Sequence, residues 1–315
     1  MLNTALYAIN FGDFYYENIG CFANYSKLGL KEIVLVHVID PALFQHNLYS
    51  VYKKEDEEKI RGLAEIKLKD IKKDLEKSGF GVRYAIRTGN VADEIADEAK
   101  NENIDFVVLD EVVLDEVVLD KKADCKLTGY FSFYGSPLYD ILIKVGKPIL
   151  IMKRVLFHPT GAIKTDENAD CKDLFADVVF ATDFSEFSLK ALPFINKVPA
   201  GVIKMFTILH VIDEKVAKNL KSEEIKNYEK NLAEKAEDAV RGLNYRFTKE
   251  KSNLEVTVRN GIPCKEITDF MTLTRKKLLI LGHKGKDKEK LAEILFGSTA
   301  ERVINALPCS ILIVK

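Results

Sequence analysis

The chain contains one long pattern twice. Four segments of the first half recur in the second half in the same order: ALYAINFGDFYY and VVFATDFSEFSL, EIVLVHVID and VIKMFTILHVID, RTGNVADEIADEA and RNGIPCKEITDFM, YGSPLYDILIKVGKPILIMK and FGSTAERVINALPCSILIVK. Asn10 and His37 are 27 residues apart, and Asp183 and His210 are also 27 residues apart. A repeat of this length with preserved spacing predicts two copies of one domain in tandem.

One interval differs between the copies. Gly89 and Gly135 are 46 residues apart, whereas Gly261 and Gly297 are 36 residues apart. The surplus of ten residues matches two extra units of VVLDE in the segment 107–120. This duplication could extend a strand, double back or loop out, and we interpret it as a sequence expansion without a function of its own.

The alternation of short apolar runs with longer amphipathic segments predicts the fold class. In each copy it indicates an open, doubly wound α/β domain with a parallel sheet that helices cover on both faces. The domains are expected at 1–153 and 173–315, with the polar segment 154–172 as a linker. In such sheets, ligands bind beyond the carboxyl ends of the strands, where the strand order changes direction.

Composition excludes several classes of function. The net charge is −1 among 315 residues, which disfavours nucleic acid or an anionic membrane as a general partner. No apolar run is long enough to span a bilayer, and the first twenty residues lack the basic region of a signal peptide. We therefore expect a cytoplasmic protein whose five scattered cysteines are free thiols.

The stretch GHKGKDKEKLAEILFGST at 282–299 carries the main chemical signal. Gly282 and Gly285 follow an apolar strand, and glycines there can adopt positive φ so that main-chain N–H groups converge on an anion. Gly297, Ser298 and Thr299 begin the last helix, whose free N–H groups and positive dipole end form a second anion seat. Together these two features predict a site that binds a phosphate chain from both sides.

These residues resemble the universal stress protein family, with two domains of that family fused. The family's ATP-binding pattern, GxxG followed by G[ST], is matched by Gly282, Gly285, Gly297 and Ser298, with a spacer two residues longer than usual. The resemblance implies the adenine nucleotide α-hydrolase-like fold. It also implies an adenine nucleotide ligand, ATP or AMP, with any Mg²⁺ or Mn²⁺ carried by the phosphates.

Further positions are assigned by the same resemblance. ATDFSE at 181–186 is similar to the family's first turn, which implies that Asp183 lies by the ribose, although it could serve only as a helix cap. The main chain of Val211 is implied to face the adenine. Lys284 could neutralise phosphate charge or be an ordinary loop lysine. The predicted binding set is Ala181, Thr182, Asp183, Val211, Gly282, Lys284, Gly285, Gly297, Ser298 and Thr299.

His37 and His210 lie in near-identical strands and are interpreted as core histidines with satisfied hydrogen bonds. No catalytic residue and no direct metal ligand is predicted.

The first copy has replaced several of these residues. The replacements are Asn10 for Asp183, Asp120 or Asp110 for Gly282, Ala123 for Gly285, and Pro137 for Thr299. A carboxylate where phosphates would bind is repulsive by about 1 kcal/mol or more at close range. We therefore expect the first domain to keep the fold and to bind nucleotide poorly or not at all.

The expected function is that of a stress-response regulator or sensor that binds nucleotide in its C-terminal domain. The alternatives are a slow ATPase and a nucleotide-independent scaffold, while an adenylating enzyme would need an SGGxDS-like loop where ATDFSE stands. The last strands of the copies, 148–153 and 310–315, are expected to pair with each other as an internal pseudo-dimer, with a homodimer as a further possibility.

Overall fold

A computed structural model describes residues 1–11, 22, 25–42, 54–114, 137–156, 173–217, 230–231, 234–235, 238, 253–284, 297–307 and 309–315. The chain separates into two compact units, the first centred on Met1–Val112 and the second on Asp173–Lys315. Among the described residues, no helix combines the length and apolar character that crossing a membrane would require.

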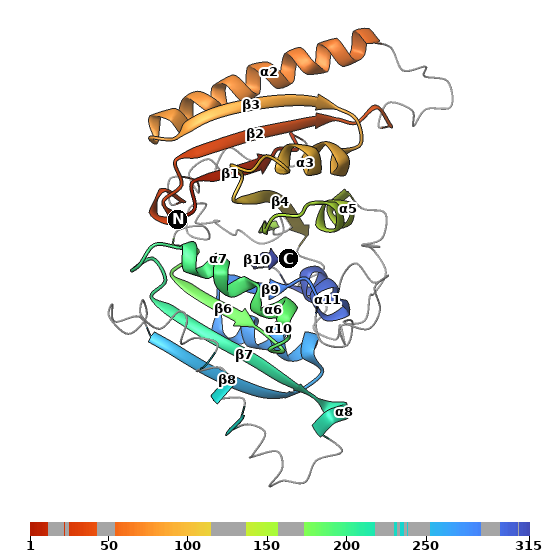
Figure 1. The fold of residues 1–315 in the computed structure, drawn as a ribbon. Helices are drawn as coiled ribbons and strands as arrows, with labels where there is room; N and C mark the ends of the chain where they lie inside the picture. The colour runs from red at the N-terminus through yellow and green to blue at the C-terminus, as the bar shows by residue number, and fades with distance from the viewer. Residues whose placement is uncertain are drawn as a thin grey trace. The chain divides into compact units, whose positions relative to one another are not determined.

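The first unit is a parallel α/β sheet (Figure 1). Its strands are β1 (Thr4–Ala8), β2 (Glu32–Ile39), β3 (Gly81–Thr88), β4 (Phe106–Leu114) and β5 (Ile149–Leu156), in the spatial order β3-β2-β1-β4-β5. Its helical elements are η1 (Ser26–Leu28), α2 (Lys54–Lys77), α3 (Val91–Ala99) and α5 (Pro137–Lys144).

The second unit repeats this arrangement. Its strands are β6 (Asp177–Ala181), β7 (Met205–Asp213), β8 (Asn253–Gly261), β9 (Leu278–Gly282) and β10 (Ser310–Val314), in the order β10-β9-β6-β7-β8. Its helices are α6 (Glu186–Leu189), α7 (Ala191–Lys197), α8 (Glu214–Ala217), α10 (Pro263–Thr274) and α11 (Ser298–Ala306). The predicted doubly wound fold is confirmed in both units.

The apolar runs form the centre of each sheet because helices cover both of its faces. All five residues of β9 are buried, as are the last four residues of β6 and of β10. The strand-to-helix turn after β3 also recurs after β8. Gly89 and Gly261 have φ of 157° and 154°, and each lies against a glutamate of the following helix, Glu94 or Glu266.

Three further details concern the helices, the cysteines and the VVLDE repeat. The segment 185–198 forms two helices, with Lys190 ending α6 and preceding α7. Cys264 is buried and disulfide-bonded, so the expectation of five free thiols is wrong, although Cys309 is a free thiol. Most of the segment 222–243, and the end of the VVLDE repeat, lie outside the described residues.

Candidate functional site

Several of the predicted residues of the second unit lie at the ends of β6 and β9, where the strand order changes direction. Strand β6 has β9 on one side and β7 on the other (Figure 1). Ala181 pairs in register with Leu281, so that Thr182 and Gly282 are the next positions at the carboxyl edge of the sheet. This is the place where an open α/β sheet binds its ligand.

The turn after β6 is held by its own polar side chains. Thr182 Oγ1 accepts a hydrogen bond from the Phe184 N–H (2.9 Å), and Asp183 Oδ1 accepts from the Ser185 N–H (3.0 Å) and hydroxyl (2.7 Å). Ser185 in turn caps α6 by accepting from the Ser188 N–H. Asp183 therefore supports the helix cap, and its contact with a ribose stays a prediction.

A histidine braces the same turn from the neighbouring strand. His210 Nδ1 lies 2.8 Å from the Thr182 carbonyl oxygen, and its ring packs on Phe184 at a centroid distance of 5.4 Å. Phe184 has a φ of 57°, an unusual value for a residue with a side chain. The ring contact and the turn's hydrogen bonds hold it there.

The first unit contains the same brace. His37 Nδ1 lies 2.9 Å from the Ile9 carbonyl oxygen, and its ring packs on Phe11 at 4.6 Å. Burial lowers the pKa of His37. The interpretation of His37 and His210 as histidines with satisfied hydrogen bonds is therefore confirmed.

Gly282 is required for a reason different from the predicted one. It ends β9 and is absent from the glycines with positive φ. A Cβ atom at Gly282 would lie 2.6 Å from the Ser188 Cα and 3.1 Å from the Phe187 carbonyl oxygen. The glycine therefore allows α6 to pack directly on β9. Gly285, the second predicted glycine, lies outside the described residues.

The start of α11 is tied to the end of β9. The His283 N–H donates to the Val314 carbonyl (3.0 Å), and the Gly297 N–H donates to the His283 carbonyl (2.8 Å). The Gly297 amide is therefore committed to the protein and does not face a ligand. Gly297 gives α11 no side-chain cap, and the first-turn amides of Ser298 and Thr299 have no acceptor within the helix.

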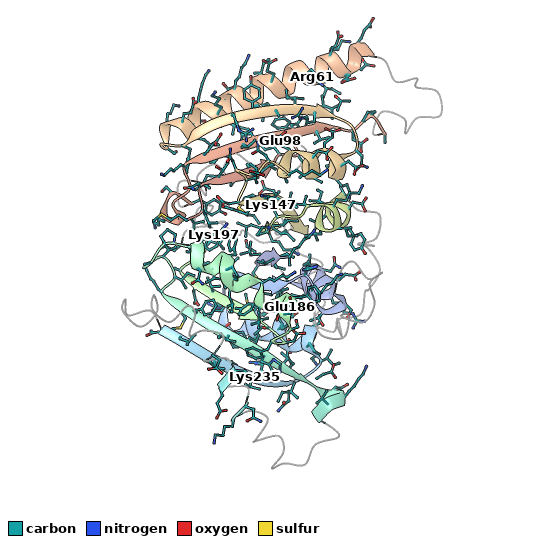
Figure 2. The ribbon with its side chains drawn as sticks, viewed as in Figure 1. Arg61, Glu98, Lys147, Glu186, Lys197 and Lys235 are labelled. Atoms are coloured by element: carbon teal, nitrogen blue, oxygen red, sulfur yellow. The ribbon has the colours of Figure 1, made fainter. Side chains whose placement is uncertain are left out.

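A cluster of basic side chains surrounds Phe187 beside this junction. The ammonium groups of Lys190 and Lys284 lie 5.0 Å and 5.8 Å from the centre of the Phe187 ring, and the His283 ring meets it edge-on at 5.7 Å. Glu186, labelled in Figure 2, marks the start of α6, which carries Phe187. Burial and the positive charges of Lys315, Lys284 and Lys190 lower the pKa of His283 to about 4.

Sequence reasoning missed Phe187 and Lys190, and it assigned no role to His283. The segment EFSLK reads as an ordinary amphipathic helix start, and its approach to β9 depends on a contact between residues about 95 positions apart in the chain.

Val211 lies on β7 two residues beyond the last residue that pairs with β6. The last register pair between β6 and β7 is Ala181 with Leu209, and the Leu209 carbonyl accepts from the Thr182 N–H (3.0 Å). Alternate residues of a parallel strand direct their main-chain groups to the same neighbour. The main-chain groups of Val211 therefore point to the same side of β7 as those of Leu209, at a level beyond the end of β6.

The first unit replaces the glycine with an acid. Ala8 pairs in register with Leu109, as Ala181 does with Leu281, so Asp110 is the structural counterpart of Gly282. This settles the choice between Asp110 and Asp120. The Tyr7 hydroxyl donates a hydrogen bond to the Asp110 carboxylate.

Aromatic side chains fill the space beside Tyr7. Its ring packs on Phe22 at 4.7 Å, and Phe22 packs on Tyr25 at 5.2 Å. Burial and the neighbouring Asp110 raise the pKa of Tyr25. Pro137 begins α5, while Asp120 and Ala123 lie outside the described residues.

Within the described part of the chain, no group of three or more His, Cys, Asp or Glu side chains is placed to hold a metal ion. The groups at the second unit's sheet edge include main-chain amides and hydroxyls at the start of α11, the ammonium groups of Lys190 and Lys284, and the Asp183 carboxylate. The amides, hydroxyls and ammonium groups among them suit an anion with several oxygen atoms.

Known structures share this fold. A universal stress protein from Archaeoglobus fulgidus DSM 4304 superposes with a TM-score of 0.65 over 99% of this chain and 96% of its own, at 17% identity. A putative universal stress protein from Pseudomonas aeruginosa UCBPP-PA14 superposes with a TM-score of 0.57 over 100% of this chain and 93% of its own, at 12% identity. At these identities, the likeness concerns the fold.

Sequence relatives are also universal stress proteins. One from Methanocaldococcus jannaschii is 26% identical over 145 residues, which cover 46% of this chain and 84% of the relative. A second from the same organism is 28% identical over 157 residues, covering 45% of this chain and 96% of the relative. The family model described as "Universal stress protein family" matches residues 29–111 and 175–315. The chain therefore belongs to the universal stress protein family.

Proposed function

We propose that the second unit binds an adenine nucleotide, ATP or AMP, across the carboxyl ends of β7, β6 and β9. The protein would act as a stress-response regulator whose state follows nucleotide occupancy. The observation that carries this proposal is the junction at His283. There, the Gly297–His283 hydrogen bond (2.8 Å) fixes an uncapped helix start beside the end of β9.

The other residues at this edge fit the parts of the ligand. Asp183 is half-buried at the end of β6, where a carboxylate can accept hydrogen bonds from ribose hydroxyls. In this proposal, the Val211 main chain contacts the base. The amides of Ser298 and Thr299 and the positive dipole end of α11 bind phosphate, which the uncapped start of this helix supports. A divalent ion would arrive with the phosphates, which ordinarily supply part of its coordination.

In this proposal the first unit does not take part in nucleotide binding. Asp110 places a carboxylate where the second unit has Gly282. Negative charge at this position opposes phosphate. The expected stoichiometry is therefore one nucleotide per chain.

Isothermal titration of the full-length chain with ATP and with AMP tests the proposal. One site per chain is the expected result. Two sites would overturn the assignment of the first unit as non-binding. No heat and no shift in melting temperature with either nucleotide would refute nucleotide binding and favour a scaffold.

The same samples decide between binding and turnover. In this proposal the nucleotide is bound and not turned over, so we expect no phosphate release beyond the uncatalysed rate. Sustained release of phosphate would instead identify a slow ATPase. Pairing of the last strands, within one chain or in a homodimer, stays a prediction.

A further inference from the structure

The basic cluster around Phe187 is not accounted for by the family's glycine pattern. Lys190 follows α6 and Lys284 follows β9, and both ammonium groups lie within 6 Å of the Phe187 ring centre. In the part of the chain that the structure describes, neither lysine has a carboxylate partner. Both ammonium groups therefore lie around one ring, and an anion bound there would be attracted by both charges.

The cluster lies beside the predicted phosphate seat. Lys284 is adjacent in sequence to His283, whose carbonyl accepts the hydrogen bond from Gly297 at the start of α11. The charges of Lys190, Lys284 and Lys315 all act on the His283 ring. The helix start and the lysines therefore direct positive potential at the same junction.

The order of the strands determines which part of a nucleotide would reach the lysines. Val211 lies on β7, Asp183 follows β6, and Lys284 follows β9, in that spatial order. Adjacent strands are about 4.8 Å apart, so β7 and β9 are separated by about 10 Å. A nucleotide with its base at β7 directs its phosphates towards β9, and the terminal phosphates of a triphosphate extend furthest.

We propose that Lys190 and Lys284, held against the Phe187 ring, bind the terminal phosphates of a nucleoside triphosphate and make the site prefer ATP to AMP. This inference rests on the proposed function, because it assumes that the base and ribose bind at β7 and β6. Phe187 acts as a platform that positions the two ammonium groups through cation–π contacts.

Paired titrations of the full-length chain with ATP and AMP test this preference at low salt. The wild-type chain should bind ATP at least tenfold more tightly than AMP. Lys190→Gln and Lys284→Gln should each weaken ATP binding about fivefold to tenfold and change AMP binding less than about twofold, because each removes one charge-assisted contact to phosphate. Equal losses for both nucleotides, or a wild-type chain without preference, would overturn the proposal.

A matched control uses Lys204, an exposed lysine that immediately precedes β7 and so lies at the opposite, amino edge of the sheet. Lys204→Gln makes the same change of charge, and it should alter neither affinity. An equal effect of Lys204→Gln would show that overall charge, not position, determines ATP binding. Thermal melts of each variant confirm that the fold is retained.

A variant of the platform separates position from charge. Phe187→Leu keeps both lysines and an apolar side chain, and it should lose part of the ATP preference while AMP binding is unchanged. Full retention of the preference would remove Phe187 from the proposal.

Inorganic tripolyphosphate distinguishes a failure of this inference from a failure of the proposed function. It should compete with ATP in the wild-type chain and lose most of its binding in the double variant Lys190→Gln, Lys284→Gln. Lysine-dependent binding of tripolyphosphate without any nucleotide binding would sustain the lysine site and refute the nucleotide function. Nucleotide binding that is unchanged in the double variant would refute the lysine site and sustain the nucleotide function.

Discussion

A side chain at Gly282 would collide with the backbone of Ser188, whose Cα atom lies 2.6 Å from the position of the missing Cβ. Helix α6 and strand β9 are therefore in contact at a glycine, so this glycine of the predicted phosphate-binding pattern is also required for packing. We expect Gly282→Ala to lower the free energy of unfolding by about 1–3 kcal/mol through overpacking. Urea denaturation measures this change.

The control for this variant is Gly62→Ala in α2, where a Cβ meets nothing within 4 Å. That substitution should instead raise stability, by about 0.5–1 kcal/mol, because alanine is the better helix former. An unchanged stability of Gly282→Ala would mean that α6 does not pack on β9 as described. Loss of nucleotide binding in a Gly282 variant is therefore not, by itself, a measure of lost phosphate contacts.

The amide of Ser298 offers a cleaner test of the helix start. Ser298 is the first residue of α11, and Gly297 before it has extended backbone angles (φ −75°, ψ 135°) that are compatible with a following proline. Ser298→Pro removes one N–H at the helix position that best tolerates proline. We expect nucleotide affinity to fall about tenfold or more with little change in stability.

Ser298→Ala is the companion variant, since it removes the hydroxyl and keeps the amide. Its affinity should lie between those of the wild type and Ser298→Pro in the same titration. If Ser298→Pro binds as well as the wild type, the helix start is not the phosphate seat.

His283 should make stability depend on pH. Its pKa is lowered from the ordinary 6.5 to about 4 in the folded chain, mainly by burial. The unfolded chain therefore takes up a proton as the pH falls below 6.5, and the folded chain does so only near pH 4. Stability contributed by the neutral ring is present above pH 6.5 and is lost between pH 6.5 and 4.

The loss should be on the order of 1–2 kcal/mol, because solvent screens a ring that is only partly buried. Denaturation at a series of pH values measures it, with His283→Gln as the comparison. In that variant, the free energy of unfolding should fall less steeply with decreasing pH. The pH dependence that remains should include the contribution of His37, whose pKa is also lowered. Identical slopes in the two proteins would exclude His283 as the titrating group.

The hydrogen bond from Tyr7 to Asp110 should contribute to the stability of the first unit. A double-mutant cycle with Tyr7→Phe and Asp110→Ala isolates the pair. The expected coupling energy is about 1.5–3 kcal/mol, the usual range for a hydrogen bond to a charged group. A coupling near zero in urea denaturation would show that the two side chains do not act together.

The sequence predicted the tandem fold well because the signals for it are local. Apolar runs such as LLIL at 278–281 and the spacing of Asp183 and His210 recur in both halves, and each unit builds them into the same place. The role of the two histidines was also predicted correctly, because a histidine inside a strand needs a nearby partner.

The parts that could not be predicted depend on contacts between distant segments. Gly282 was assigned to backbone freedom because its true neighbour, Ser188, is far away in the chain. Phe187 and Lys190 carried no motif. The repeated VVLDE left the counterpart of Gly282 undecided between Asp110 and Asp120, and the pairing of Ala8 with Leu109 was needed to choose.

Each histidine stabilises its turn without contacting a residue that is expected to bind a ligand through its side chain. His37 and His210 hold their turns through main-chain oxygens, and neither brace uses a side chain that is expected to touch a ligand. Point substitutions at the sheet edge can then change what one copy recognises while its shape persists. A doubled chain of this kind can evolve a new specificity in one half and retain the ancestral one in the other.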